Sequence, residues 1–86
     1  MSEVKKSVIW APEAQAQLRA IDRATALDIL HAVDDYLTLG KGDAKKLRPP
    51  RGELRLRVGD YRVFLYQLAP LSIRITGVKH RSQAYR

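Results

Sequence analysis

Cysteine is absent from this 86-residue chain, which excludes disulfide bonds and thiolate-ligated metal sites. Long apolar runs are absent too: residues 1–6 lack the hydrophobic stretch of a signal peptide, and no segment is apolar enough to span a bilayer. Phosphate-loop, dinucleotide-binding and hydrolase-nucleophile motifs are missing, and His31 has no second histidine at ligand spacing. We therefore expect a single cytoplasmic domain over residues 1–86, with no membrane contact, no metal and no cofactor.

Acidic residues are scarce in the second half of the chain. Residues 44–86 hold eleven Lys or Arg against Glu53 and Asp60, a net charge of +9, whereas residues 1–43 hold five against seven, a net charge of −2. The overall charge of +7 favours a polyanionic partner: nucleic acid, an acidic protein or an anionic membrane. Much of this charge is placed within alternating apolar segments, and cations on strands can build a phosphate-binding surface of defined geometry.

The first half predicts a strand followed by two helices. Residues Val4–Trp10 end in the apolar side chains of a short strand, and Pro12 opens a helix, since a first helical position needs no N–H partner. Asp22 is the predicted N-cap of a second helix that runs to about Leu39 and stops at Gly40. Helical spacing assigns the buried stripes to Ala14, Leu18, Ile21, Ala26, Ile29, Leu30, Val33 and Leu37.

The second half predicts a three-stranded antiparallel meander after a connector over Lys41–Gly52. Apolar and charged residues alternate, as in half-buried strands, and Gly59-Asp60 is a two-residue hairpin signal. The expected strands are residues 53–58, Tyr61–Leu68 and Leu71–Val78, with a turn at Ala69-Pro70 and a short basic tail over Lys79–Arg86. The fold is thus expected to be α+β, with the helical hairpin on one sheet face and a basic, open face opposite.

A turn at Gly59-Asp60 determines which residues of its two strands face each other. Leu54 and Leu56 then lie opposite Leu65 and Val63 on the helix side, whereas Glu53, Arg55 and Arg57 lie opposite Tyr66, Phe64 and Arg62 on the open side. Directly opposed like charges are destabilising by roughly 0.2–1 kcal/mol, so we interpret Arg57 and Arg62 as projecting outward together around an anion or a partner's carboxylate. Arg74 and Thr76 alternate with isoleucines and are candidates for the same surface. The alternative is a solvated sheet face whose arginine stems cover apolar area.

The tail adds three kinds of group to this surface. Lys79 and Arg81 supply cations, His80 can give or take a proton near neutral pH, and Tyr85 can stack on an exposed base. Each has a plainer alternative, because a lone histidine is often a bystander and a C-terminal tyrosine often packs against its own domain.

Two segments resemble a known family. Residues Leu54–Val63 (LRLRVGDYRV) and Val78–Tyr85 (VKHRSQAY), preceded by the strand, the helical hairpin and the Lys46-Leu47 connector, resemble the RelE/ParE superfamily of bacterial type II toxins. The resemblance covers nearly the whole chain, and it implies a cognate antitoxin protein as partner.

The resemblance to the RelE branch implies a ribosome-dependent endoribonuclease that cleaves mRNA without metal, by attack of a 2′-hydroxyl on the adjacent phosphate. By motif position, Arg55 matches a sheet lysine that acts as base, Arg62 an arginine that stabilises the transition state, Lys79 or Arg81 the acid, and Tyr85 a residue that orients or stacks on the substrate. Arginine stays protonated at neutral pH, which leaves Glu53 or His80 as the base. The expected RNA-binding residues are Lys46, Arg48, Arg57 and Arg74.

Two other functions compete with this one. A ParE-like toxin would share the fold and poison DNA gyrase without nuclease activity. Glu53, in place of a second sheet lysine, also leaves open a non-toxic relic or a plain binding module on the same scaffold.

Overall fold

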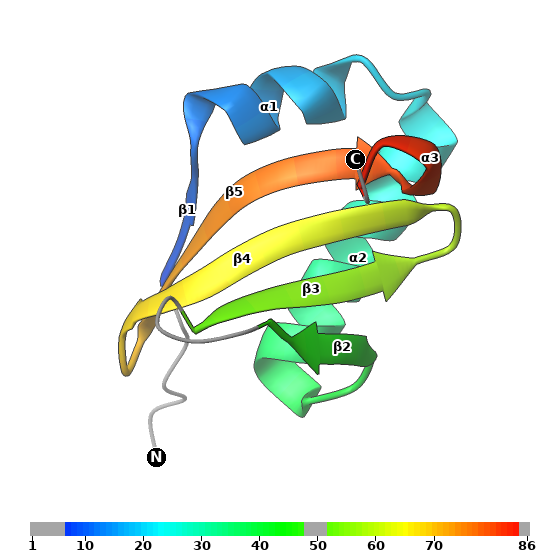
Figure 1. Ribbon diagram of the computed structural model, residues 1–86. Helices are drawn as coiled ribbons and strands as arrows, with labels where there is room; N and C mark the ends of the chain where they lie inside the picture. The colour runs from blue at the N-terminus through cyan, green and yellow to red at the C-terminus, as the bar shows by residue number, and fades with distance from the viewer. Residues whose placement is uncertain (1–6, 48–51, 85–86) are drawn as a thin grey trace.

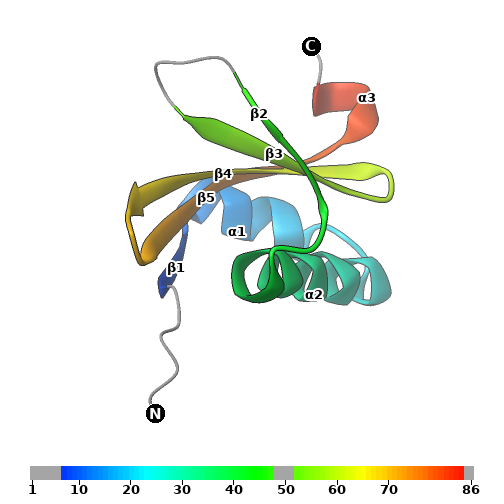
Figure 2. The same ribbon diagram turned by 90° about the horizontal axis from the view of Figure 1, so that it is seen from below.

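The computed structural model describes residues 7–47 and 52–84. Two helices cover one face of a five-stranded sheet, and a third, short helix lies on the opposite face (Figures 1 and 2). The α+β architecture predicted from the sequence is therefore confirmed. In chain order the elements are β1 (Ser7–Trp10), α1 (Pro12–Arg19), α2 (Arg23–Leu39), β2 (Asp43–Lys46), β3 (Glu53–Val58), β4 (Tyr61–Ala69), β5 (Ser72–His80) and α3 (Arg81–Ala84).

The sheet is mixed, with the strand order β1-β5-β4-β3-β2. The antiparallel meander of β3, β4 and β5 is the predicted one, and the β3–β4 pairs have the predicted register, with Leu56 opposite Val63 and Arg57 opposite Arg62. Gly59 has a φ of +58°, and no non-glycine residue in the described ranges has a positive φ, which is the pattern of a type II′ turn. The first strand, β1, pairs in parallel with β5 at the sheet edge.

Local signals in the sequence account for the limits of α2. The Asp22 carboxylate caps its N-terminus by accepting from the Thr25 backbone N–H at 3.0 Å. This hydrogen bond holds the pKa of Asp22 below its ordinary value of 3.8. The helix ends at Gly40, as predicted.

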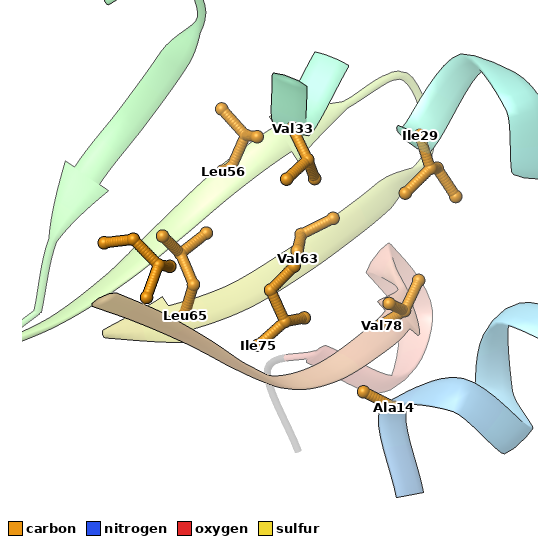
Figure 3. Close-up of a cluster of buried hydrophobic side chains, with 9 residues drawn as sticks. Ala14, Ile29, Val33, Leu56, Val63, Leu65, Ile75 and Val78 are labelled. Atoms are coloured by element: carbon orange, nitrogen blue, oxygen red, sulfur yellow. The ribbon is translucent and has the colours of Figure 1, made fainter. Parts of the chain in front are cut away.

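The core lies between the helices and the sheet (Figure 3). Ile29 and Val33 of α2 and Ala14 of α1 point toward the inward side chains of β3, β4 and β5. Leu30 was predicted to be buried beside them, but it is 38% exposed because the buried stripe of α2 is narrower than its apolar pattern. Within the described ranges, no helix combines the length and the apolar composition needed to cross a membrane.

The predicted connector over residues 41–52 contains a strand that the sequence analysis missed. Asp43–Lys46 forms β2, antiparallel to β3, with Ala44 opposite Leu56. Gly42 permits this close approach: its φ is +141°, and a Cβ there would lie 3.0 Å from Leu56 Cδ1. Four residues with one apolar side chain are too few to show the alternation by which strands are recognised.

The end of the chain also differs from the prediction. The last strand continues to His80, and Arg81–Ala84 then forms the helix α3 instead of an irregular tail. The turn before that strand is shifted as well, since β4 includes Ala69. Beyond the end of β1, a side chain from α1 completes the edge of β5, because Gln17 Oε1 accepts from the Val78 backbone N–H at 2.7 Å.

Candidate nucleic-acid interface

The sheet register brings cations from four strands onto the face opposite α1 and α2. We call this surface the basic face. Its basic and aromatic side chains, assigned by strand alternation and pairing, are Lys45 of β2, Arg55 and Arg57 of β3, Arg62, Phe64 and Tyr66 of β4, and Arg74 and Lys79 of β5. Among the described elements, the short helix α3 is the one that lies over this face (Figure 2).

A row of paired residues crosses the basic face beside the Gly59-Asp60 turn. Asp43, Arg57, Arg62 and Lys79 occupy matching positions on β2, β3, β4 and β5. Arg57 and Lys79 are exposed, so two cations project on either side of Arg62. Asp43, beside Arg57, is the acidic member of this row.

The Arg62 guanidinium does not project into solvent as expected, because the residue is only 6% exposed. Its Nη1 donates to the Gly59 carbonyl oxygen at 3.0 Å and to the Tyr61 carbonyl oxygen at 2.9 Å. These hydrogen bonds draw the charge toward the turn. They provide a structural reason for placing Arg62 opposite Arg57, since the two guanidinium groups need no shared anion to coexist.

The rows farther from the turn combine cations with aromatic rings. Lys45, Arg55 and Phe64 share one row, and Glu53, Tyr66 and Arg74 share the next. Lys45 is exposed, and the other members are half-buried. Glu53 thus lies on the basic face, four residues along β3 from Arg57, which corresponds to roughly 13 Å.

Lys79, His80 and Arg81, which the sequence analysis grouped together, are placed differently by the structure. Lys79 lies on the basic face opposite Arg62, whereas His80 lies opposite Tyr61, and their rings meet edge to face at 5.4 Å. Arg81 begins α3 and joins it to the turn: its backbone N–H donates to the Asp60 carbonyl oxygen at 2.7 Å. Arg81 and Asp60 also form an exposed ion pair, with 3.9 Å between Nε and Oδ1, and such a pair contributes little to stability.

The contacts of His80 define the proton position on its ring. The Ser82 backbone N–H points at Nδ1 over 3.2 Å, and Ser82 Oγ lies 2.9 Å from the same atom. A backbone N–H can only donate, so Nδ1 accepts and the neutral ring carries its proton on Nε2.

Three of the residues expected in the site are not assigned to the basic face: Lys46, Arg48 and Tyr85. Lys46 lies opposite Leu54, so the register places it on the helix side of the sheet. Arg48 and Tyr85 lie outside the described residues. Lys45, which the sequence analysis did not single out, is the lysine of β2 on the basic face; its only signal was the neighbouring apolar Ala44, which determines the alternation. Across residues 7–47 and 52–84, no three His, Cys, Asp or Glu side chains come together as a metal-binding group.

The fold recurs in solved structures of toxin–antitoxin complexes. A chain of the archaeal RelE–RelB complex from Pyrococcus horikoshii OT3 is 24% identical with a TM-score of 0.75, and the match covers 93% of this chain and 99% of that one. A chain of the RelBE2 complex from Mycobacterium tuberculosis is 22% identical with a TM-score of 0.74, over 91% of this chain and 100% of that one. A chain of the RelB–RelE complex from Methanococcus jannaschii is 21% identical with a TM-score of 0.72, over 90% and 94%.

At these identities the likeness establishes a RelE-type toxin fold. The family follows from the sequence: residues 8–85 match the model of the ParE toxin of the type II toxin–antitoxin system parDE. The chain therefore belongs to the ParE toxin family, within the RelE/ParE superfamily predicted from its motifs, and is a type II toxin. No curated protein matches it.

Proposed function

We propose that this toxin is a ribosome-dependent mRNA endoribonuclease of the RelE type, acting in the cytoplasm without a metal ion. The observation that carries the proposal is the row beside the turn, in which exposed Arg57 and Lys79 flank Arg62 on adjacent strands. Cations at matching positions on three adjacent strands suit a phosphodiester, whose transition state gains negative charge on its oxygens.

The reaction requires the 2′-hydroxyl to lose a proton, the phosphorane to be stabilised and the leaving 5′-oxygen to gain a proton. Arg57 and Lys79 are suited to stabilise the phosphorane, and Arg62, held by the turn carbonyls, adds positive charge between them. Glu53 is roughly 13 Å along β3 from Arg57, too far to act on a phosphate bound by this row, so solvent water accepts the proton of the 2′-hydroxyl.

We assign protonation of the leaving oxygen to Lys79, which is exposed on the basic face opposite Arg62. His80 follows Lys79 on β5 and faces the other side of the sheet, opposite Tyr61, so it is not placed to reach a phosphate on the basic face. Arg55, which stays protonated, contributes charge and not base catalysis. Arg81 and Arg74 extend the cationic surface along the RNA, together with Lys45.

The test is primer extension on mRNA from cells that express the toxin, alongside reactions with purified ribosomes. We expect codon-spaced cleavage by the wild type, and losses of at least tenfold for Arg57→Gln and Lys79→Gln, since positioned charges and proton donors each contribute this much or more. Arg23→Gln, on α2 at the other side of the sheet, is the matched charge control. Intact transcripts during growth arrest would refute the nuclease.

Inhibition of DNA gyrase is the second candidate function. It is favoured by the match to the parDE toxin model and by the use of the Arg62 guanidinium inside the fold. Supercoiling assays with purified gyrase decide between the two, because a gyrase poison would block supercoiling and leave mRNA intact. A chain that neither arrests growth nor inhibits gyrase would instead be a non-toxic relic.

We also propose that a cognate antitoxin binds this chain. The solved relatives are complexes with RelB antitoxins, and the basic face is suited to an acidic segment of such a partner. Attraction between opposite charges speeds encounter and is screened by salt, so we expect the association rate constant to fall as ionic strength rises. A rate constant independent of salt would contradict an electrostatic role for the basic face.

A further inference from the structure

Two aromatic side chains on the basic face have no part in the reaction proposed above. Phe64, the single phenylalanine of the chain, and Tyr66 lie two residues apart on β4, on the same side of the sheet. Both residues are half-buried. Their separation along the strand is roughly 6.6 Å, about twice the 3.4 Å spacing of stacked bases.

A glycine lies opposite Phe64 on the neighbouring strand. This residue, Gly77 of β5, is buried, and a Cβ built there would lie 3.5 Å from Gln17 Oε1 and 3.8 Å from Phe64 Cδ2. The pairing shifts next to this position, and Thr76 Oγ1 donates to the Phe64 carbonyl oxygen at 3.2 Å. Bulges of this kind commonly re-aim side chains next to functional sites. One edge of the Phe64 ring therefore lies close to β5 at Gly77.

Tyr66 lies between two groups of opposite charge. Its cross-strand partners are Glu53 on β3 and Arg74 on β5, and both are half-buried on the same face. A guanidinium beside an aromatic ring extends the surface on which a base can stack, and a carboxylate accepts from the exocyclic amino group of cytosine. The same acceptor suits the amino group of adenine, whereas uracil has no such group.

We propose that Phe64 and Tyr66 form a stacking platform for two adjacent unpaired bases of single-stranded RNA, with Glu53 favouring an amino-bearing base at Tyr66. This inference rests on the proposed nuclease function, in which the row beside the turn holds the phosphate backbone. Phe64 is two residues along β4 from Arg62, so a base stacked on its ring lies roughly 6.6 Å along the strand from that row. The spacing of the rings favours separated bases, each on its own ring, over a continuous base stack.

The direct test is the binding of labelled, unstructured oligoribonucleotides to the full chain, measured by fluorescence anisotropy over a range of salt concentrations. We expect Tyr66→Leu to weaken binding roughly ten- to one-hundred-fold, since stacking on one aromatic ring contributes about that factor. Tyr66→Phe, which keeps the ring, should bind within about threefold of the wild type. Neither variant should change the salt dependence, whereas Arg57→Gln should lower its slope by about one.

Phe64→Leu should also weaken binding, but this variant uncovers Gly77, so its thermal unfolding is measured in parallel and binding is compared below the unfolding transition. Glu53→Gln should reduce the preference for oligonucleotides of cytosine over those of uracil. Unchanged affinity of folded Tyr66→Leu, equal competition by duplex RNA, or equal affinity of the wild type for cytosine and uracil oligonucleotides would each overturn the proposal.

The outcome for this platform can be separated from the outcome for the nuclease. If the wild type cleaves mRNA on ribosomes and Tyr66→Leu does so with the same KM, the platform is wrong and the nuclease stands. If the wild type leaves mRNA intact but binds RNA in a Tyr66-dependent manner, the nuclease is wrong and the platform stands.

Discussion

The two faces of β4 bury their side chains by different means. Toward α1 and α2, Val63 and Leu65 are 0% exposed and are surrounded by other apolar residues. On the basic face, Arg62 is nearly as deeply buried at 6%, but its guanidinium is held by carbonyl oxygens of the turn. One face is thus stabilised by packing and the other by hydrogen bonds. Substitutions on the two faces should therefore differ in cost and in kind.

The largest effect is expected on the packed face. Leu65→Ala removes a fully buried side chain and should lower the free energy of unfolding by roughly 2–5 kcal/mol, through lost burial and the cavity left behind. Leu68→Ala is the matched control, since it makes the same chemical change on the same strand at a residue that is 48% exposed. Its cost should be below about 1 kcal/mol. Equal shifts in urea unfolding would mean that this face is not closely packed.

Arg62 should show the second-largest effect. Arg62→Met keeps a long apolar stem but leaves the Gly59 and Tyr61 carbonyl oxygens without their donor, at a cost of roughly 1.5–3 kcal/mol. Arg57→Met, at the exposed partner position, should change the free energy of unfolding by no more than about 0.5 kcal/mol. Loss of toxicity in Arg62→Met therefore has to be measured at a temperature where the variant is folded. If Arg62→Met and Arg57→Met had the same free energy of unfolding, the hydrogen bonds from Arg62 to the turn would contribute nothing to stability.

A polar contact on the helix side tests whether a buried hydrogen bond also contributes to stability beside the packed core. Gln17→Leu leaves the Val78 backbone N–H without an acceptor and should cost about 1–3 kcal/mol. Hydrogen exchange at the Val78 amide should accelerate in this variant more than exchange at amides within β4. Gln15→Leu is the control, because its 3.4 Å hydrogen bond to the Trp10 carbonyl oxygen is exposed. Equal exchange rates at Val78 in both variants would contradict the role of Gln17.

The register of the basic face could be predicted because a two-residue turn leaves one arrangement of its flanking strands. The pairing of Arg57 with Arg62 follows from the position of Gly59-Asp60 alone. Alternation, however, states which face a side chain occupies and not how deeply it is buried. The burial of Arg62 depends on where its guanidinium turns, and the sequence pattern contains no such information.

Features that depend on partners distant in the sequence were missed. The strand β2 exists because β3 offers it a pairing edge, and its own sequence, Asp43–Lys46, has no strand period. The shift at Thr76 in the β4–β5 pairing has the same origin, since a bulge is defined by two strands together. The limits of α2 were predictable because Asp22 and Gly40 act locally.

The smallest expected effect concerns the start of the helical layer and depends on pH. The hydrogen bond from Thr25 lowers the pKa of the Asp22 carboxyl in the folded state relative to its ordinary value of 3.8. The unfolded chain therefore binds more protons in this range, and stability contributed by Asp22 is present above pH 3.8 and is lost as pH falls through the folded pKa. Asp22→Asn keeps an oxygen that can cap α2 but does not titrate, so its stability should fall less on acidification than that of the wild type. The measurement is thermal unfolding between neutral and acidic pH. Asp28→Asn, which removes a carboxylate within the same helix but not at its cap, should follow the wild-type curve. Parallel curves for the wild type and Asp22→Asn would show that the cap does not contribute to the acid sensitivity.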